Sequence, residues 1–201
     1  MARPRKFDDD AVLLRATDLF WKRGVDAVSI RDLEVSLELR APSIYRRFHS
    51  KEELLVRCLD RYVEQEVGGR IRRFLDDVDD PIVGLRNFFT SALRPHRGEQ
   101  RLRGCFLTTT AAHTKAGGPE VQASVDRGFA LIEEAFRRQI ERAKQAGHVG
   151  PAADAAATAK ALLLSFQGLL VLARSGAPDL EAGIDATFRA HFGATTVPDV
   201  R

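Results

Sequence analysis

A short basic stretch contains the side chains with the clearest chemistry in this sequence. No acidic residue occurs between Leu39 and Lys51, and the stretch contains Arg40, Arg46, Arg47, His49 and Lys51. Guanidinium and ammonium groups bind phosphate oxygens, and a guanidinium also binds the O6 and N7 atoms of guanine with two hydrogen bonds. A solvated basic face is the simpler interpretation of any such run. The pattern around the stretch must therefore decide between DNA binding and plain solvation.

Two cysteines are the other candidates for chemistry. Cys105 follows Gly104 at an expected helix start and is flanked by Arg101 and Arg103. A helix N-terminus and nearby cations favour the reactive thiolate, which makes Cys105 a candidate sensor of electrophiles. A buried, inert thiol is the alternative, and Cys58, on an apolar helix face, is expected to be inert. Two cysteines are too few for a disulfide framework and fit reduced thiols in the cytoplasm.

The sequence lacks the common catalytic and metal-binding patterns. It contains no HExxH, no GxSxG, no glycine-rich phosphate loop and no cysteine pair with metal-ligand spacing, and its five histidines are scattered. We therefore expect no enzyme activity, no catalytic residues, no metal site and no cofactor.

The composition is that of a globular protein, with 44% hydrophobic and 29% charged residues and a net charge of +3. No apolar segment follows the basic N-terminus, so a signal peptide is not expected. Polar residues interrupt the apolar stretch from Ala155 to Ala173, which argues against a membrane span. We expect a cytoplasmic protein.

The elements that must position these side chains are all expected to be helices, because no segment alternates apolar and polar residues as a strand would. Their signals, in chain order, are acidic residues at the start of Asp9–Arg23, a terminating Gly24, a capping box of Ser29 and Asp32, Pro42 in a first turn, and a second capping box of Ser50 and Glu53. Three short helices, of which the third is basic, predict a helix-turn-helix unit. In such a unit the second helix of the motif enters the major groove.

The residues around this turn resemble the N-terminal domain of TetR-family transcriptional regulators. The matching stretches are Ser29–Leu33, Leu39–Phe48 and Ser50–Leu55, in which Tyr-x-x-Phe is followed by Ser-Lys-Glu-x-Leu. The resemblance implies an all-α fold with a helix-turn-helix domain at 1–50, including an arm at 1–7, and an effector-binding and dimerisation domain at 51–201. One position departs from the family. Glu38 stands where a glycine with positive φ is usual. A residue other than glycine costs about 1 kcal/mol or more in that conformation, so either the turn geometry differs slightly from the family's or the domain tolerates the strain.

The resemblance also implies roles for the residues near the turn. Tyr45 and Lys51 are expected to bind backbone phosphates, whereas Arg46 and Arg47 are expected to read bases. Replacing Arg47 by alanine should then relax sequence preference, and replacing Lys51 should weaken binding to all sequences alike. The full set of predicted DNA-binding residues is Arg31, Ala41, Pro42, Ser43, Tyr45, Arg46, Arg47 and Lys51.

The C-terminal part is expected to form a homodimer through its last two helices, about Ala152–Arg174 and Asp179–Phe192. The first of these is apolar nearly all round and needs partners on more than one side. The predicted dimer-interface residues are Leu162, Leu163, Phe166, Leu169, Leu170 and Phe188.

An effector site among the middle helices is implied by the same resemblance. The candidate lining is mostly aromatic, which suggests a small apolar or electrophilic effector, although each residue is also explained as plain core. The candidates are Phe88, Phe89, Cys105, Phe106, His113, Phe129, Phe136 and Phe166. The resulting hypothesis is a repressor that binds palindromic double-stranded operator DNA and is released by the effector. A transcriptional activator of the same family and a helical interaction module without DNA function are the alternatives.

Overall fold

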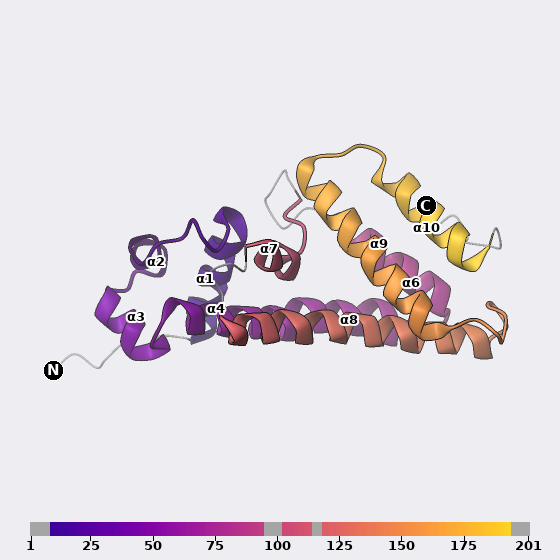
Figure 1. Ribbon diagram of the computed structural model, residues 1–201, viewed down its shortest axis with the longest axis horizontal. Coiled ribbons are helices and arrows are strands. Elements are labelled where there is room, and N and C mark those ends of the chain that lie inside the picture. Colours follow the sequence, from indigo (N-terminus) through magenta and orange to yellow (C-terminus); the bar gives the residue numbers. More distant parts are fainter. Residues whose placement is uncertain (1–8, 95–101, 114–117, 194–201) are drawn as a thin grey trace. The chain divides into compact units, whose positions relative to one another are not determined.

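The computed structural model describes residues 9–94, 102–113 and 118–193, and these residues form helices and turns without a β-strand among them (Figure 1). The predicted all-α fold is confirmed. The predicted arm at 1–7 lies outside the described residues. The chain packs as two units, one of residues 1–65 and 106–127 and the other of residues 66–105 and 128–201.

The first unit contains four helices from the N-terminal part of the chain. They are α1 (Asp9–Arg23), α2 (Ile30–Leu37), α3 (Ala41–Phe48) and α4 (Lys51–Tyr62), joined by α7 (Phe106–Ala112) and the beginning of α8 (Pro119–Gln145). Helix α1 packs on α4, and Asp10 accepts two hydrogen bonds from Arg61, at 2.6 and 3.0 Å. The pairing with Arg61 lowers the pKa of Asp10. Helix α4 also contacts α3, and α7 contacts α1 and α4, so both helices belong to this unit by their contacts. The domain boundary at residue 50 stays a prediction.

A long interrupted helix connects the two units. Helix α4 continues through a π-helical segment η1 (Val63–Val67), helix α5 (Gly68–Ile71) and a second π-helical segment η2 (Arg72–Asp76). The two glycines, Gly68 and Gly69, thus lie between two segments with the i→i+5 hydrogen bonds of a π-helix. Such segments are often found at functional sites.

The second unit contains α5, η2, α6 (Pro81–Ser91), most of α8, α9 (Ala155–Ser175) and α10 (Leu180–Phe192). The side chain of Asp80 caps α6 by accepting the N–H groups of Ile82 and Val83, at 2.8 and 3.1 Å. Arg142 of α8 donates to the carbonyls of Leu75, Val78 and Asp79, at 3.0–3.2 Å. A single guanidinium therefore satisfies backbone carbonyls at the end of η2 and in the turn that follows it.

Helix α9 is apolar and long enough to cross a membrane by length and composition. In the second unit, however, one stripe of this helix lies in the core, including Leu162, Phe166 and Leu170. Its apolar character is therefore accounted for in part by packing within its own unit.

Candidate nucleic-acid interface

Helix α3 has one face in the core and one face in solvent. Ile44 and Phe48, four residues apart, are fully buried, as expected for a pair on one side of a helix. The opposite face presents Pro42, Tyr45 and Arg46, and 46% of Tyr45 is exposed. A half-exposed tyrosine directly beside an exposed arginine is suited to binding a polyanion.

In the turn before α3, Glu38 has the positive φ that is usual for a glycine, so the strained alternative is the one that is found. Glu38 adopts a left-handed conformation with φ 55° and ψ 35°, and its N–H donates to the carbonyl of Glu34. The carboxylate of Glu34 accepts the N–H of Ala41 at 2.6 Å. Glu34 therefore binds the turn with its backbone and the first N–H of α3 with its side chain, a role that the sequence analysis missed.

A second sharp turn, after α3, sets the direction of α4. His49 has φ 57° and ψ −41°, and the N–H of Ser50 donates to the carbonyl of Phe48 at 2.6 Å. Such a γ-turn with positive φ is rare and strained. The hydroxyl of Ser50 then accepts the N–H of Glu53 at 3.0 Å, which caps α4 as predicted. The turn places Lys51 at the first position of α4, beside helix N–H groups that favour an anion.

Only half of the predicted second capping box is formed. The carboxylate of Glu53 lies 3.0 Å from Nδ1 of His49 rather than on the backbone of Ser50. The first capping box, of Ser29 and Asp32, is complete.

The two arginines predicted to read bases have different surroundings. Arg46 is exposed, and it forms no ion pair with any carboxylate in the part of the chain that is described. Arg47 pairs with Asp9 of α1, and 26% of its side chain is exposed. Arg46 is therefore available to a ligand directly, whereas Arg47 can bind a ligand only after it releases Asp9.

Asp32 is the most perturbed carboxyl group of this unit. It accepts hydrogen bonds from the hydroxyl and the N–H of Ser29, at 2.5 and 2.9 Å, and from Arg23 at 2.5 Å. These bonds, those from Ser29 foremost, lower the pKa of Asp32 to about 2. Arg31, beside it on α2, is exposed. The start of α2 is thus fixed by a carboxylate that remains ionised well into the acidic range.

Both cysteines are buried. Cys58 is fully buried, its thiol lies 3.7 Å from the carbonyl of Leu13, and burial raises its pKa to about 12. Cys105 is 5% exposed and comes just before α7, which begins at Phe106 rather than near Arg103 as expected. Gly104, with φ +73°, is the reason, since that conformation does not fit within a right-handed helix.

The predicted effector residues fall into the two different units. Four of them, Phe88, Phe89, Phe136 and Phe166, form one buried cluster with ring centroids 4.9–6.1 Å apart. Phe129 lies on α8 in the same unit and is partly exposed.

The remaining aromatic candidates belong to the first unit. The ring of Phe106 packs against Trp21 and Tyr62, at centroid distances of 6.0 and 5.7 Å. His113 is exposed and lies 3.5 Å from a carboxylate oxygen of Asp26. Hydrophobic spacing in the sequence carried no information on which core each aromatic side chain joins.

The predicted dimer residues are buried within their own unit. They are Leu162, Leu163, Phe166, Leu169, Leu170 and Phe188, with exposures of 8% or less. A different stripe of α9 faces solvent, formed by Leu164, Val171 and Leu172, which are 67%, 53% and 53% exposed.

Comparison with known families gives two matches along the chain. Residues 12–58 match "Bacterial regulatory proteins, tetR family". Residues 81–181 match "Tetracyclin repressor-like, C-terminal domain". The first match contains α2, α3 and the start of α4, so it covers the exposed basic face described above.

Relatives and solved structures agree with these matches. The chain is 26% identical to the HTH-type transcriptional repressor ComR of Escherichia coli K12 over 175 residues, which is 87% of this chain and 83% of ComR. It is equally similar to YezE, an uncharacterised HTH-type transcriptional regulator of Bacillus subtilis, covering 90% of that protein. A cysteine mutant of the TetR family regulator CifR, solved with 26-bp double-strand operator DNA, superposes with a TM-score of 0.78 at 28% identity, covering 94% of this chain and 97% of CifR.

Proposed function

Because the chain belongs to the TetR family of bacterial regulatory proteins, we propose that it is a transcriptional repressor in the cytoplasm. It binds double-stranded operator DNA as a homodimer and leaves the DNA when a small effector binds. The observation that carries this proposal is the exposed face of α3, with Tyr45 and Arg46 in solvent and Lys51 at the start of α4. The relative ComR is a repressor by name, and CifR was solved on its operator.

The contacts divide by chemistry into positioning and reading. Tyr45, Lys51 and the N–H groups at the start of α4 hold backbone phosphates, which fixes the register without reading sequence. Arg46 reads a guanine in the major groove. Arg47 also reads a base once DNA has replaced Asp9 as its partner. Breaking the ion pair of Arg47 with Asp9 costs free energy, and a weak DNA site offsets this cost less well than a strong one. The small or short side chains Ala41, Pro42 and Ser43 allow the start of α3 to approach base edges and phosphates closely, with Arg31 beside them.

A dimer supplies the second reading helix. The exposed apolar stripe of α9, Leu164, Val171 and Leu172, is the surface that supports dimerisation, because large apolar side chains gathered on one helix face mark interaction sites. Two recognition helices related by a two-fold axis read a palindrome whose half-sites are about 34–36 Å apart.

The effector is proposed to bind in the second unit. An apolar effector would have to open the phenylalanine cluster, because the rings of Phe88, Phe89, Phe136 and Phe166 already fill the space between their helices. An electrophilic effector would have to reach Cys105, which is 5% exposed.

Direct DNA binding tests the proposal. The purified full-length protein is titrated against fluorescent DNA from upstream of its own gene and against a scrambled duplex of the same length, at several salt concentrations. Salt-sensitive binding that prefers the upstream DNA is expected, because phosphate contacts release counterions. Binding that does not distinguish the two duplexes, with no preferred site recovered by selection from random DNA, would refute a repressor role.

Variants of α3 and α4 assign the contacts. Arg46→Ala should lower the preference for the upstream DNA by about 1–3 kcal/mol, the value of one bidentate base contact. Lys51→Ala should weaken binding to both duplexes alike and lower the salt slope by about one unit. Arg137→Ala, which removes an exposed arginine from α8, is the matched control and should leave both affinities unchanged.

A further inference from the structure

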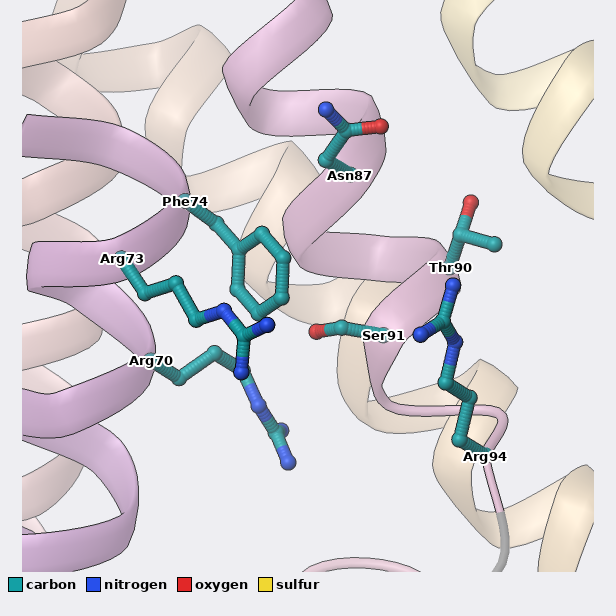
Figure 2. Close-up of a pocket in the computed structure, with 7 residues that line it drawn as sticks. All are labelled: Arg70, Arg73, Phe74, Asn87, Thr90, Ser91 and Arg94. Atoms are coloured by element: carbon teal, nitrogen blue, oxygen red, sulfur yellow. The ribbon is translucent and has the colours of Figure 1, made fainter. Parts of the chain in front are cut away.

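A pocket of about 420 Å³ opens in the second unit between α5–η2 and α6. On the side of α5–η2, the pocket is lined by Arg70, Arg73 and Phe74. On the side of α6 and the turn that follows, it is lined by Asn87, Thr90, Ser91 and Arg94. Figure 2 shows the Phe74 ring and the Ser91 hydroxyl facing each other across the pocket, with Arg70 and Arg73 on one side and Arg94 on the other. This volume is within the range of small-molecule sites, about 300–1,000 Å³.

Close packing at one end fixes the pocket between the two helices. A Cβ atom on Gly84 of α6 would lie 2.7 Å from the carbonyl oxygen of Phe74. The backbones of α6 and η2 therefore touch at Gly84. Asn87 and Thr90 lie one and two turns further along α6 and line the pocket. Helix packing thus shapes the walls formed by α5–η2 and α6, and Arg94 is added from the turn after α6.

The pocket is cationic. It has three guanidinium groups and no carboxylate in its lining, and within the described part of the chain none of the three arginines pairs with a carboxylate. Two of them instead lie over aromatic rings. The Cζ atom of Arg70 is 5.7 Å from the ring centre of Phe88, and that of Arg73 is 5.4 Å from the ring centre of Phe74. Three like charges around one cavity repel one another unless an anion joins them.

The neutral side chains narrow the choice of ligand. The hydroxyls of Thr90 and Ser91 donate to the carbonyls of Arg86 and Phe88, at 3.0 and 2.7 Å. Because the Ser91 hydroxyl donates its proton to the carbonyl of Phe88, its oxygen, which points toward Phe74 in Figure 2, faces the pocket mainly as an acceptor. Donors come from the arginines and from the amide of Asn87, while the ring of Phe74 supplies an apolar wall. A carboxylate or phosphate group fits the guanidinium forks, and an apolar body attached to it fits the ring.

We propose that this pocket binds a small organic oxyanion, a carboxylate or phosphate that carries an apolar or aromatic body. Arg70, Arg73 and Arg94 bind the oxygens, Asn87 donates to them, and Phe74 contacts the body. Such a ligand joins α5–η2 to α6. If the protein is the repressor proposed above, this pocket is its effector site, and binding of the oxyanion there releases the protein from DNA. The segment that carries Arg70 and Arg73 continues α4, which begins at Lys51.

Titration calorimetry on the full-length protein without DNA tests binding. The probes are benzoate and phenyl phosphate, with benzamide as the uncharged analogue of benzoate, in a buffer free of phosphate and organic acids. At least one of the two anions should bind, with an affinity that falls as salt rises, and benzamide should not. Comparing benzoate with phenyl phosphate distinguishes a carboxylate ligand from a phosphate ligand.

Arginine variants locate the site. Arg70→Gln and Arg73→Gln should each raise the Kd about tenfold or more, as expected for the loss of a charge-assisted hydrogen bond. Arg189→Gln, on exposed α10, should not change it. Circular dichroism checks that each variant is folded. Arg94 lies beyond the end of α6, so Arg94→Gln should also raise the Kd without disturbing the packing of α6 on η2.

The outcomes separate this inference from the proposed function. Failure of both anions to bind up to about 10 mM, equal binding of benzamide, or equal losses in Arg189→Gln would overturn the pocket. If the pocket variants lose affinity for operator DNA when no anion is present, the arginines are DNA contacts and the inference is also wrong. An anion that binds but does not release operator DNA overturns the effector role alone. Absence of sequence-specific DNA binding overturns the repressor proposal and leaves anion binding standing.

Discussion

Two glycines in the second unit allow the same substitution to be tested with opposite outcomes. At Gly84, an added Cβ would lie 2.7 Å from the carbonyl oxygen of Phe74, so α6 and η2 must move apart. Overpacking of this kind costs about 1–3 kcal/mol, whereas replacing glycine by alanine within a helix gains about 0.5–1 kcal/mol. At Gly69, in α5, nothing lies within 4 Å of the added Cβ. Only the helix gain then remains.

Gly69→Ala should therefore stabilise the protein, and Gly84→Ala should be less stable than Gly69→Ala by about 1–3 kcal/mol. Thermal unfolding followed by circular dichroism at one fixed protein concentration measures the difference. One kcal/mol moves the midpoint by about 2–4 °C in a protein of this size. A Gly84→Ala protein as stable as Gly69→Ala would refute the close contact, and with it the packing that shapes the arginine-lined pocket.

Four further outcomes follow from backbone strain, ionisation, burial and thiol reactivity. Glu38→Gly should stabilise the protein by about 0.5–1 kcal/mol in denaturant unfolding, because glycine adopts positive φ without strain; an unchanged or lower stability would contradict the left-handed turn. The pKa of Asp32 is about 2 against an ordinary 3.8, so its stabilising effect is complete above about pH 3.8 and is lost as the pH falls through 2. In Ser29→Ala, an NMR titration should find this pKa closer to 3.8, and an unshifted value would point away from the capping box. Cys58, whose pKa is raised to about 12, should resist N-ethylmaleimide in the folded protein, as read by mass spectrometry. If an electrophile releases the protein from DNA, Cys105→Ser should abolish the response, and a response that persists would exclude Cys105 as the sensor.

The features that the sequence predicts well are those determined within a few residues of chain. Ser29 and Asp32 are three positions apart, and both bonds of their capping box form. Glu38 is recognised from the sequence as the position where a positive φ is usual, and it has that conformation. Helix α1 has the predicted bounds, with acidic residues in its first turn and Gly24 after its last.

Features that depend on contacts between elements were not predictable in this way. The carboxylate of Glu34 caps α3 seven residues further along the chain, and no spacing rule covers that distance. Phe88 and Phe106 have the same chemistry and similar apolar neighbours in the sequence, yet they belong to the cores of different units. Arg70, Arg73 and Arg94 each look like ordinary solvated charges. They converge because α5–η2 packs on α6 and because the turn after α6 brings Arg94 to the same pocket.

Helix α9 illustrates how burial changes the meaning of a sequence pattern. An apolar helix is expected to need partners on more than one side, but composition alone does not say which side faces which partner. Leu169 and Leu170 face their own unit, whereas Val171 and Leu172, one helical step further, face solvent. A substitution at Leu169 would therefore report on folding, since truncating a buried leucine costs about 2–5 kcal/mol whether or not a dimer forms. A polar substitution at Leu172 would leave this core intact, so dissociation of the dimer and loss of operator binding in that variant would be attributable to the interface.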